Sequence, residues 1–215
     1  TIVDTIIRYL KDNPGCSVHA SLPCTAWSIW QRMAIHRYGP SYEEKLSKKR
    51  EVSMKMVRSI CKIADLCIDL GGEFSFEWPR YCTGWSLKPL MELIHRHQLY
   101  LVDVDGCPFG MVSQNCTPIL KQWRFACSSA RLAISLQGCR CKHPTGFKHA
   151  VIEGSETKKT ELYPISLCKT YLTALFGDDY YVPAMPVTIS GDQQHRVKEI
   201  GYSDSQISPF TSCDL

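Results

Sequence analysis

Cys24 stands where an apolar run of the sequence ends in a turn, a position that suits a nucleophile. It follows Pro23 at the end of the run CSVHASLPC and precedes a segment of helical character. A thiol in this position lies near backbone amides and the positive end of a helix dipole, and both lower its pKa. The alternative is a buried structural cysteine, because the chain contains 12 Cys and most such residues serve packing.

Glu77 is a carboxylate at the end of a second apolar run, EFSFEWP, between Phe76 and Trp78. A charge at the end of a buried strand is costly unless it is paired. Glu77 is therefore either part of a structural ion pair or kept to bind a ligand.

A third set of reactive side chains has the spacing C-x-C-x-H-x5-H: Cys139, Cys141, His143 and His149. Alternate residues of an extended segment share a side, and the Pro-Thr-Gly turn returns the last histidine toward the others. Thiolate and imidazole ligands favour zinc, in tetrahedral geometry when all four bind. The alternative is a basic loop with unligated thiols. Two further cysteines are spare ligands: Cys127 and Cys168.

The elements that must position these residues follow from periodicity, glycine and proline. Apolar residues at 3–4 residue spacing and stop signals predict helices. Alternating or continuous apolar runs predict strands. The predicted helices cover 1–12, 26–38 in part, 42–70, 87–97, 130–136 and 166–176, and the predicted strands cover 16–24, 73–79, 99–105 and 121–127. This alternation predicts an α/β sandwich with a mostly parallel sheet, whose chemistry sits at the carboxyl ends of strands.

Length and composition indicate one globular domain, residues 1–176, with an irregular segment at 138–161 and an extended or partly disordered tail at 177–215. With 44% hydrophobic and 21% charged residues, the 215-residue chain is not of the disordered class. No run approaches the ~20 apolar residues of a membrane helix, and no secretory signal is visible. Twelve Cys in 215 residues are too sparse for a disulfide scaffold. We therefore expect reduced thiols and a nuclear or cytoplasmic protein that is not secreted.

Basic residues concentrate in the first part of the chain, although the net charge is only +4. Residues 1–150 carry 20 basic and 12 acidic side chains, whereas 151–215 carry 5 and 9. The helix predicted at 42–70 carries the side chains that could follow a phosphate backbone, namely Lys45, Lys48, Lys49, Arg50 and Lys55. The alternative is a solvated helix face, because three glutamates interrupt the run.

Four segments of the chain together resemble the DNA cytosine-5 methyltransferases, in particular their divergent phage and mobile-element versions. LPCTAWS is similar to the Pro-Cys loop of that family, and FEWP lies where the family has Glu-Asn-Val. GCPFGMVSQNCTPILKQWRF is similar to the segment that carries the Gln-x-Arg-x-Arg motif, and YPISLC resembles a helix start near the end of the divergent versions. The resemblance covers roughly residues 1–176 and implies a Rossmann-like methyltransferase-type sandwich.

The resemblance implies a role for each matching residue. Cys24 would add to C6 of a flipped cytosine, Glu77 would bind the ring nitrogen and amine, and Arg124 would be the third catalytic residue. The implied cofactor is S-adenosylmethionine, and the implied partner is nucleic acid. The residues that would shape the two loops are Pro23, Thr25, Ser28, Trp78 and Pro79.

The chain departs from this family at the cofactor site. The Phe-x-Gly-x-Gly loop of the family's first half has no counterpart here, so the chain resembles only the C-terminal half of the fold. A second hypothesis follows from this gap. The chain would be a non-catalytic module that binds nucleic acid or serves as a structural subunit, with a protein partner covering the exposed edge of its sheet.

Overall fold

The structure of the chain, a computed structural model, describes residues 1–152, 157 and 160–177. The tail predicted at 177–215 lies outside the described residues except for Gly177. The helices are α1 (Ile2–Asp12), α2 (Gln31–Tyr38), α3 (Pro40–Asp69), α4 (Lys88–Arg96), α5 (Ala130–Gln137) and α7 (Ile165–Phe176). The strands are β1 (Val18–Ser21), β2 (Phe74–Pro79), β3 (Tyr100–Asp105) and β4 (Gln122–Cys127). Three 3-10 turns connect them: η1 (Thr25–Trp27), η2 (Thr83–Ser86) and η3 (Cys107–Phe109).

The four strands form one sheet in the order β1-β2-β4-β3. β1 and β2 are parallel, whereas β4 is antiparallel to both of its neighbours, β2 and β3. The mixed α/β class is confirmed, but the expectation of a mostly parallel sheet is wrong. The physical reason is the connection between β3 and β4, which contains no crossover helix, and a parallel pair needs such a crossover.

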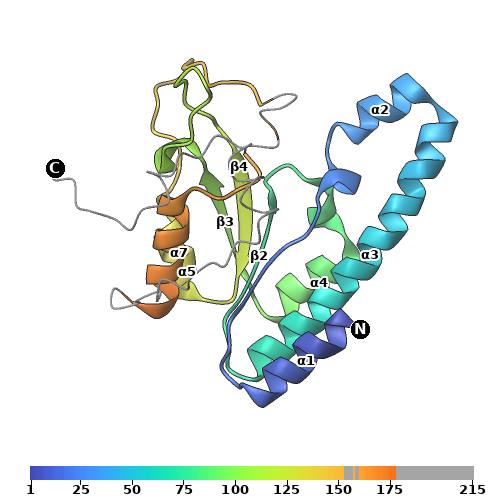
Figure 1. The fold of residues 1–215 in the computed structure, drawn as a ribbon, viewed down its shortest axis with the longest axis vertical. Coiled ribbons are helices and arrows are strands. Elements are labelled where there is room, and N and C mark those ends of the chain that lie inside the picture. Colours follow the sequence, from blue (N-terminus) through green and yellow to red (C-terminus); the bar gives the residue numbers. More distant parts are fainter. Residues whose placement is uncertain (153–156, 158–159, 178–215) are drawn as a thin grey trace, which may run out of the picture.

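Helices cover both faces of the sheet and make two separate cores (Figure 1). Phe74, Phe76 and Trp78 of β2 point toward the side of α1, α3 and α4 and are buried there. Trp123 and Phe125 of β4 belong to the other core, beneath α5 and α7. Because side chains alternate along a strand, the odd-numbered residues of β2 face the same side as Phe125. Glu77 therefore lies on the α5–α7 face.

The helices begin and end where the local sequence supplies caps. Thr1 caps α1, with its side chain accepting from the backbone N–H of Asp4 while the Asp4 side chain reaches back to Thr1. Pro40 occupies the first turn of α3, after Gly39 at a φ of 70°. None of the described helices combines the length and the apolar character that a membrane-spanning segment requires.

Gly84 of η2 is held against the ring of the buried Trp78. A Cβ at Gly84 would lie 2.2 Å from a ring carbon of Trp78, which is fully buried and whose indole N–H donates to the Leu22 carbonyl. We expect Gly84→Ala to lower the free energy of unfolding by about 1–3 kcal/mol, because the ring cannot move without leaving its partner. Urea denaturation measures this loss.

Gly138→Ala is the matched control for this substitution. Gly138 has φ −78° and ψ −7°, which any residue adopts, and a Cβ there would meet no heavy atom within 4 Å. Its effect should stay within about 0.5 kcal/mol. Equal losses at the two glycines would contradict this description of the packing around Trp78.

Candidate functional site

The parallel pair β1–β2 brings a buried carboxyl to the carboxyl-terminal edge of the sheet. Ser21 is the last residue of β1 and lies beside Glu77 of β2 in the strand register. The Ser21 hydroxyl donates to Oε2 of Glu77 at 2.8 Å, and the Tyr163 hydroxyl donates to the same oxygen at 2.5 Å. Glu77 is only 5% exposed, so both donors reach a carboxyl that water hardly contacts.

Burial raises the pKa of the Glu77 carboxyl above its usual range. The hydrogen bonds from Tyr163 and Ser21 and the positive charge of Lys121 act in the opposite direction but do not cancel the effect. The pKa of the Tyr163 hydroxyl is raised in turn, by burial and by the charge of Glu77. This carboxyl is therefore easier to protonate than an exposed one, and the Tyr163 hydroxyl keeps its proton.

Cys24 lies immediately before η1, in the loop that follows β1. Its carbonyl accepts from the backbone N–H of Trp27 at 2.9 Å, and its side chain is half-buried. Burial raises the pKa of the Cys24 thiol, and the charge of Glu77 raises it further, whereas Lys121 lowers it. The expected lowering of this pKa is absent, because η1 has three residues and one short turn has little dipole to offer.

Helices α2 and α3 hold the Cys24 loop in place. The side chain of Gln31, which is buried, donates to the Thr25 carbonyl at 2.7 Å and accepts from the Tyr42 hydroxyl at 2.7 Å. The Trp27 indole N–H donates to the Ser53 hydroxyl at 2.8 Å. The Ser28 hydroxyl accepts from the backbone of Trp30. The loop is therefore fixed by contacts within itself and with the two helices that follow it.

Trp78 and Pro79 connect the second loop to the first. The Trp78 indole donates to the Leu22 carbonyl at 2.7 Å, one residue before Pro23. The Pro79 carbonyl accepts from the Trp85 indole at 3.0 Å. Both residues belong to the rigid frame of the site, and the Trp78 ring lies on the face of β2 that is opposite to Glu77.

Lys121 is the cation of this site. It is half-buried, its ammonium donates to the Thr160 carbonyl, and its charge interacts with those of Glu77 and Cys24. Burial lowers the pKa of its ammonium group, and the two negative partners oppose that shift. Strand alternation was the available signal, because Lys121 is two residues before Trp123 and so shares the face of Glu77.

Arg124, the third catalytic residue implied by the resemblance, is not brought to Glu77. In the β2–β4 register it lies beside Trp78, and so its side chain is on the other face of the sheet. There it donates to both carboxylate oxygens of Asp103, at 2.7 and 3.1 Å. Arg80 and Arg140 approach the same carboxylate, at 3.0 and 3.8 Å. Arg124 therefore belongs to a structural ion-pair cluster at the end of β3.

The basic residues of α3 flank the Cys24 loop. Lys48 and Lys49 line a hollow of about 400 Å³ together with Pro23, Thr25 and Val52. On the other side of the loop, the Arg50 guanidinium lies 5.3 Å from the centre of the Trp27 ring and donates to the Ala26 carbonyl. Lys55 lines the neighbouring hollow with Arg50. Lys45 lies on the exposed surface of the same helix.

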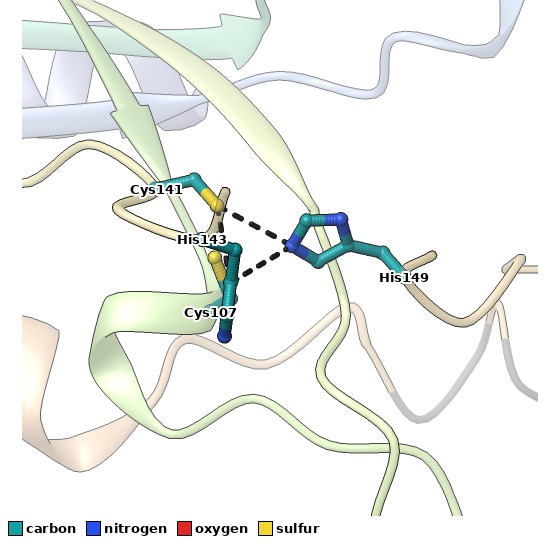
Figure 2. Close-up of side chains that lie close together, drawn as sticks. All are labelled: Cys107, Cys141, His143 and His149. Carbon is teal, nitrogen blue, oxygen red and sulfur yellow. Dashed lines mark hydrogen bonds between the residues drawn. The ribbon is translucent and has the colours of Figure 1, made fainter. Parts of the chain in front are cut away.

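Four side chains away from this site could hold a metal ion. Cys107, Cys141, His143 and His149 each offer one ligand atom, and all four atoms lie within 4.8 Å of one another. Cys107 comes from η3, and the other three come from the loop that follows α5 (Figure 2). The sequence predicted three of these four residues.

Cys139, the fourth predicted ligand, points elsewhere. Its amide donates to the Leu136 carbonyl and its thiol to the Ser135 carbonyl at 3.4 Å, so it continues the end of α5 rather than an extended segment. Cys107 takes its place in the cluster. The signal for Cys107 was its position directly after β3, in the turn GCPFG. The spare ligands are also absent from the cluster: Cys127 is buried beneath α5 and α7, and Cys168 lies on α7.

The described residues thus contain a thiol, a carboxyl and an ammonium group at one sheet edge. They also contain a separate Cys/His cluster. Comparison with protein-family models, curated proteins and solved structures finds no match for the chain. The geometry of these two clusters is therefore the ground on which a function is assigned.

The raised pKa of Glu77 predicts a pH dependence of stability. Since the folded state binds this proton more tightly than the unfolded state, the stabilisation is complete below the ordinary pKa of 4.5 and is lost as pH rises through the folded pKa. Glu77→Gln removes this loss and keeps an oxygen that accepts from Ser21 and Tyr163. The free energy of unfolding of the variant, relative to wild type, should rise between about pH 4 and pH 8.

Urea unfolding across that pH range checks this, with Glu92→Gln on the exposed side of α4 as control. A difference between wild type and Glu77→Gln that stays flat or falls with pH would show that Glu77 is not the buried carboxyl described above.

Proposed function

We propose that the chain captures a cytosine base of a nucleic acid between Cys24 and Glu77 and adds the Cys24 sulfur to the ring, as in the DNA cytosine-5 methyltransferases that it resembles. The observation that carries the proposal is the parallel pairing of β1 with β2, which places Glu77 and the loop that carries Cys24 at the same edge of the sheet. The electrostatic effect of Glu77 on the Cys24 thiol supports their proximity. Lys121, rather than Arg124, is the cation of the proposed site.

The proposed reaction has a consistent set of proton positions. The raised pKa of Glu77 makes this carboxyl a better proton donor to the ring nitrogen N3, and Glu77 in its protonated form does not oppose the Cys24 thiolate. The thiolate adds to C6, the pair of electrons of the C5–C6 double bond moves toward C5, and C5 takes a proton from solvent. Loss of the original C5 proton and of the thiolate restores the ring. The net change is exchange of the C5 hydrogen.

S-adenosylmethionine, the cofactor that the resemblance implies, does not fit the described residues. β1 and β2 are followed by Leu22-Pro23 and Arg80, and β4 by two serines, so none of them leads into a glycine-rich loop. β3 does lead into Gly106, but its turn carries Cys107 into the Cys/His cluster. The proposal is therefore confined to base capture and thiol addition, which need no methyl donor.

The basic face of α3 is the proposed contact for the nucleic-acid backbone. Lys48 and Lys49 border the hollow beside Pro23 and Thr25, so a phosphate held there would lie next to the loop that carries Cys24. The ion pair of Lys48 with Glu44, at 2.8 Å, is exposed and therefore weak. Lys48 can therefore exchange this contact for one with a phosphate.

A second candidate function is a non-catalytic nucleic-acid-binding or structural subunit. The raised pKa of the Cys24 thiol favours it, since an unactivated thiol is a poor nucleophile. Among the described residues, β1 pairs only with β2, which leaves an edge that a strand of a protein partner would cover. Zinc is the ion proposed for the Cys/His cluster under either function, and no step above uses it.

Exchange of the cytosine C5 hydrogen distinguishes the two functions. The full chain is incubated in D₂O with a cytosine-containing single-stranded oligonucleotide, and loss of the C5 proton signal is followed by NMR. We expect exchange above the uncatalysed rate, its abolition by Cys24→Ser, and a rate lower by about 10²–10⁴ for Glu77→Gln. Cys116→Ser, at an exposed cysteine, is the control.

Exchange that survives Cys24→Ser would rule out Cys24 as the nucleophile. Binding of the oligonucleotide by wild type with no exchange would favour the non-catalytic candidate.

Charge reversal at the hollow beside Pro23 tests the nucleic-acid contact. Lys48→Glu combined with Lys49→Glu should weaken oligonucleotide binding and reduce the slope of log affinity against log salt by about 1–2, because each lost phosphate contact removes roughly one released counterion. Fluorescence anisotropy at several salt concentrations measures both. Lys88→Glu, on the exposed N-terminus of α4, should change neither. An unchanged salt slope in the double variant would exclude this face of α3.

A further inference from the structure

The ligand atoms of the Cys/His cluster converge on one point. The Cys141 sulfur lies 3.2 Å from Nδ1 of His143 and 3.3 Å from Nε2 of His149, and these two nitrogens are 3.2 Å apart. Figure 2 shows these three contacts as dashed lines that form a closed triangle. All four atoms are within 4.8 Å of one another.

Hydrogen bonds can hold this triangle together if one histidine N–H donates to the Cys141 sulfur and the thiol donates to the other histidine. A cation at the centre is the alternative that uses a lone pair of every atom. For zinc, bonds of ≈ 2.0–2.1 Å to nitrogen and ≈ 2.3 Å to sulfur give tetrahedral edges of about 3.3–3.8 Å. The edges of the triangle are shorter than these by at most about 0.4 Å.

We propose that Cys107, Cys141, His143 and His149 bind a structural zinc ion. The proposal goes beyond the proposed function and holds whether or not the chain acts on cytosine. Two thiolates and two neutral imidazoles neutralise the double charge of the ion, so this partly buried site carries no net charge. Four protein ligands complete a tetrahedron and leave no position for substrate, which is the arrangement of structural rather than catalytic zinc.

Residues around the cluster hold its ligands in position. The buried carboxylate of Asp105 accepts from the backbone N–H of Cys141 at 2.8 Å and from the Arg140 guanidinium at 2.9 Å. The Phe147 ring stacks on His143 at 4.0 Å between centroids and packs edge-on against His149. These contacts orient the ligands, as outer-shell partners do in metal sites.

The ion would fasten a loop that burial does not hold. Residues 142–148 are all exposed, and such a segment loses roughly 1–2 kcal/mol per residue in conformational entropy when it is ordered. A metal bond to Cys107 links this loop to the turn after β3. That turn is itself tied to the site, because the Gly106 amide donates to the Lys121 carbonyl at 2.7 Å. Zinc binding therefore orders the loop and the backbone that carries Lys121.

Two cysteine substitutions test the ligand set against its closest alternative. The full chain and its variants are purified without added metal, and their zinc content is measured by elemental mass spectrometry. We expect about one zinc per chain in wild type and in Cys139→Ser, and almost none in Cys107→Ser. The loss of zinc affinity in Cys107→Ser should be greater than the ~10–100-fold loss that follows removal of a residue that only orients a ligand.

Retention of zinc in Cys107→Ser together with its loss in Cys139→Ser would overturn the assignment, and so would wild type that binds no zinc when the ion is supplied. A wild-type mass lower by about 2 Da, the two hydrogens lost in a disulfide between Cys107 and Cys141, would also overturn it.

Cobalt substitution keeps the proposal testable if Cys107→Ser does not fold. Wild type loaded with Co²⁺ in place of zinc should show the intense visible bands of tetrahedral cobalt and charge-transfer absorption from two thiolates. Weak bands typical of octahedral cobalt, or absorption from no thiolate, would contradict the site. Removal of the metal by a chelator should lower the midpoint of thermal unfolding, because the ion binds the folded chain.

Discussion

The parallel pairing of β1 with β2 is the constraint on which the candidate site depends. It places the ends of two strands that are far apart in the sequence at one edge of the sheet. Parallel strands require a crossover, and here α3 provides it, covering one face of the pair with apolar residues. The other face carries polar side chains, of which Glu77 is the most buried carboxyl. A site with both a thiol and a carboxyl follows from this one pairing.

Burial has opposite consequences for the two reactive groups. It raises the pKa of Glu77, which makes that carboxyl a possible proton donor, and it raises the pKa of Cys24, which makes that thiol less nucleophilic. The two effects are linked, because the Glu77 charge disfavours the thiolate. A ligand that takes the proton from Glu77 leaves a negative charge that disfavours the Cys24 thiolate. A ligand that neutralises the charge of Glu77 favours the thiolate. The positive charge of Lys121 favours both the Glu77 carboxylate and the Cys24 thiolate.

The order and type of the elements could be predicted from the sequence, because periodicity and stop residues are local signals. The 3–4 residue spacing along α3 and the glycine stop after it correspond to Pro40–Asp69. Strand direction is a long-range property. The position of β4 between β2 and β3 depends on which strand edges pair, and the antiparallel pairing followed only from the missing crossover helix.

The same distinction explains which site residues could be predicted. Glu77 lies near the end of β2 and Cys24 lies in the loop after β1, so the strand ends identify them. Arg124 and Lys121 are three residues apart, and only the register of β4 decides which of them faces Glu77. Cys107 joins Cys141 through the fold, and no local spacing connects two residues so far apart. Cys139 had the right spacing but belongs to the end of α5.

The Cys24 thiol and the Glu77 carboxyl influence each other's ionisation, and the pKa of the Cys24 thiol measures this influence most directly. The pH dependence of alkylation of the peptide that contains Cys24 gives this pKa, in wild type and in Glu77→Gln. We expect a pKa above the ordinary 9.0 in wild type and a lower one in the variant, because the variant lacks the nearby negative charge. Identical values in the two proteins would show that the groups do not share a site.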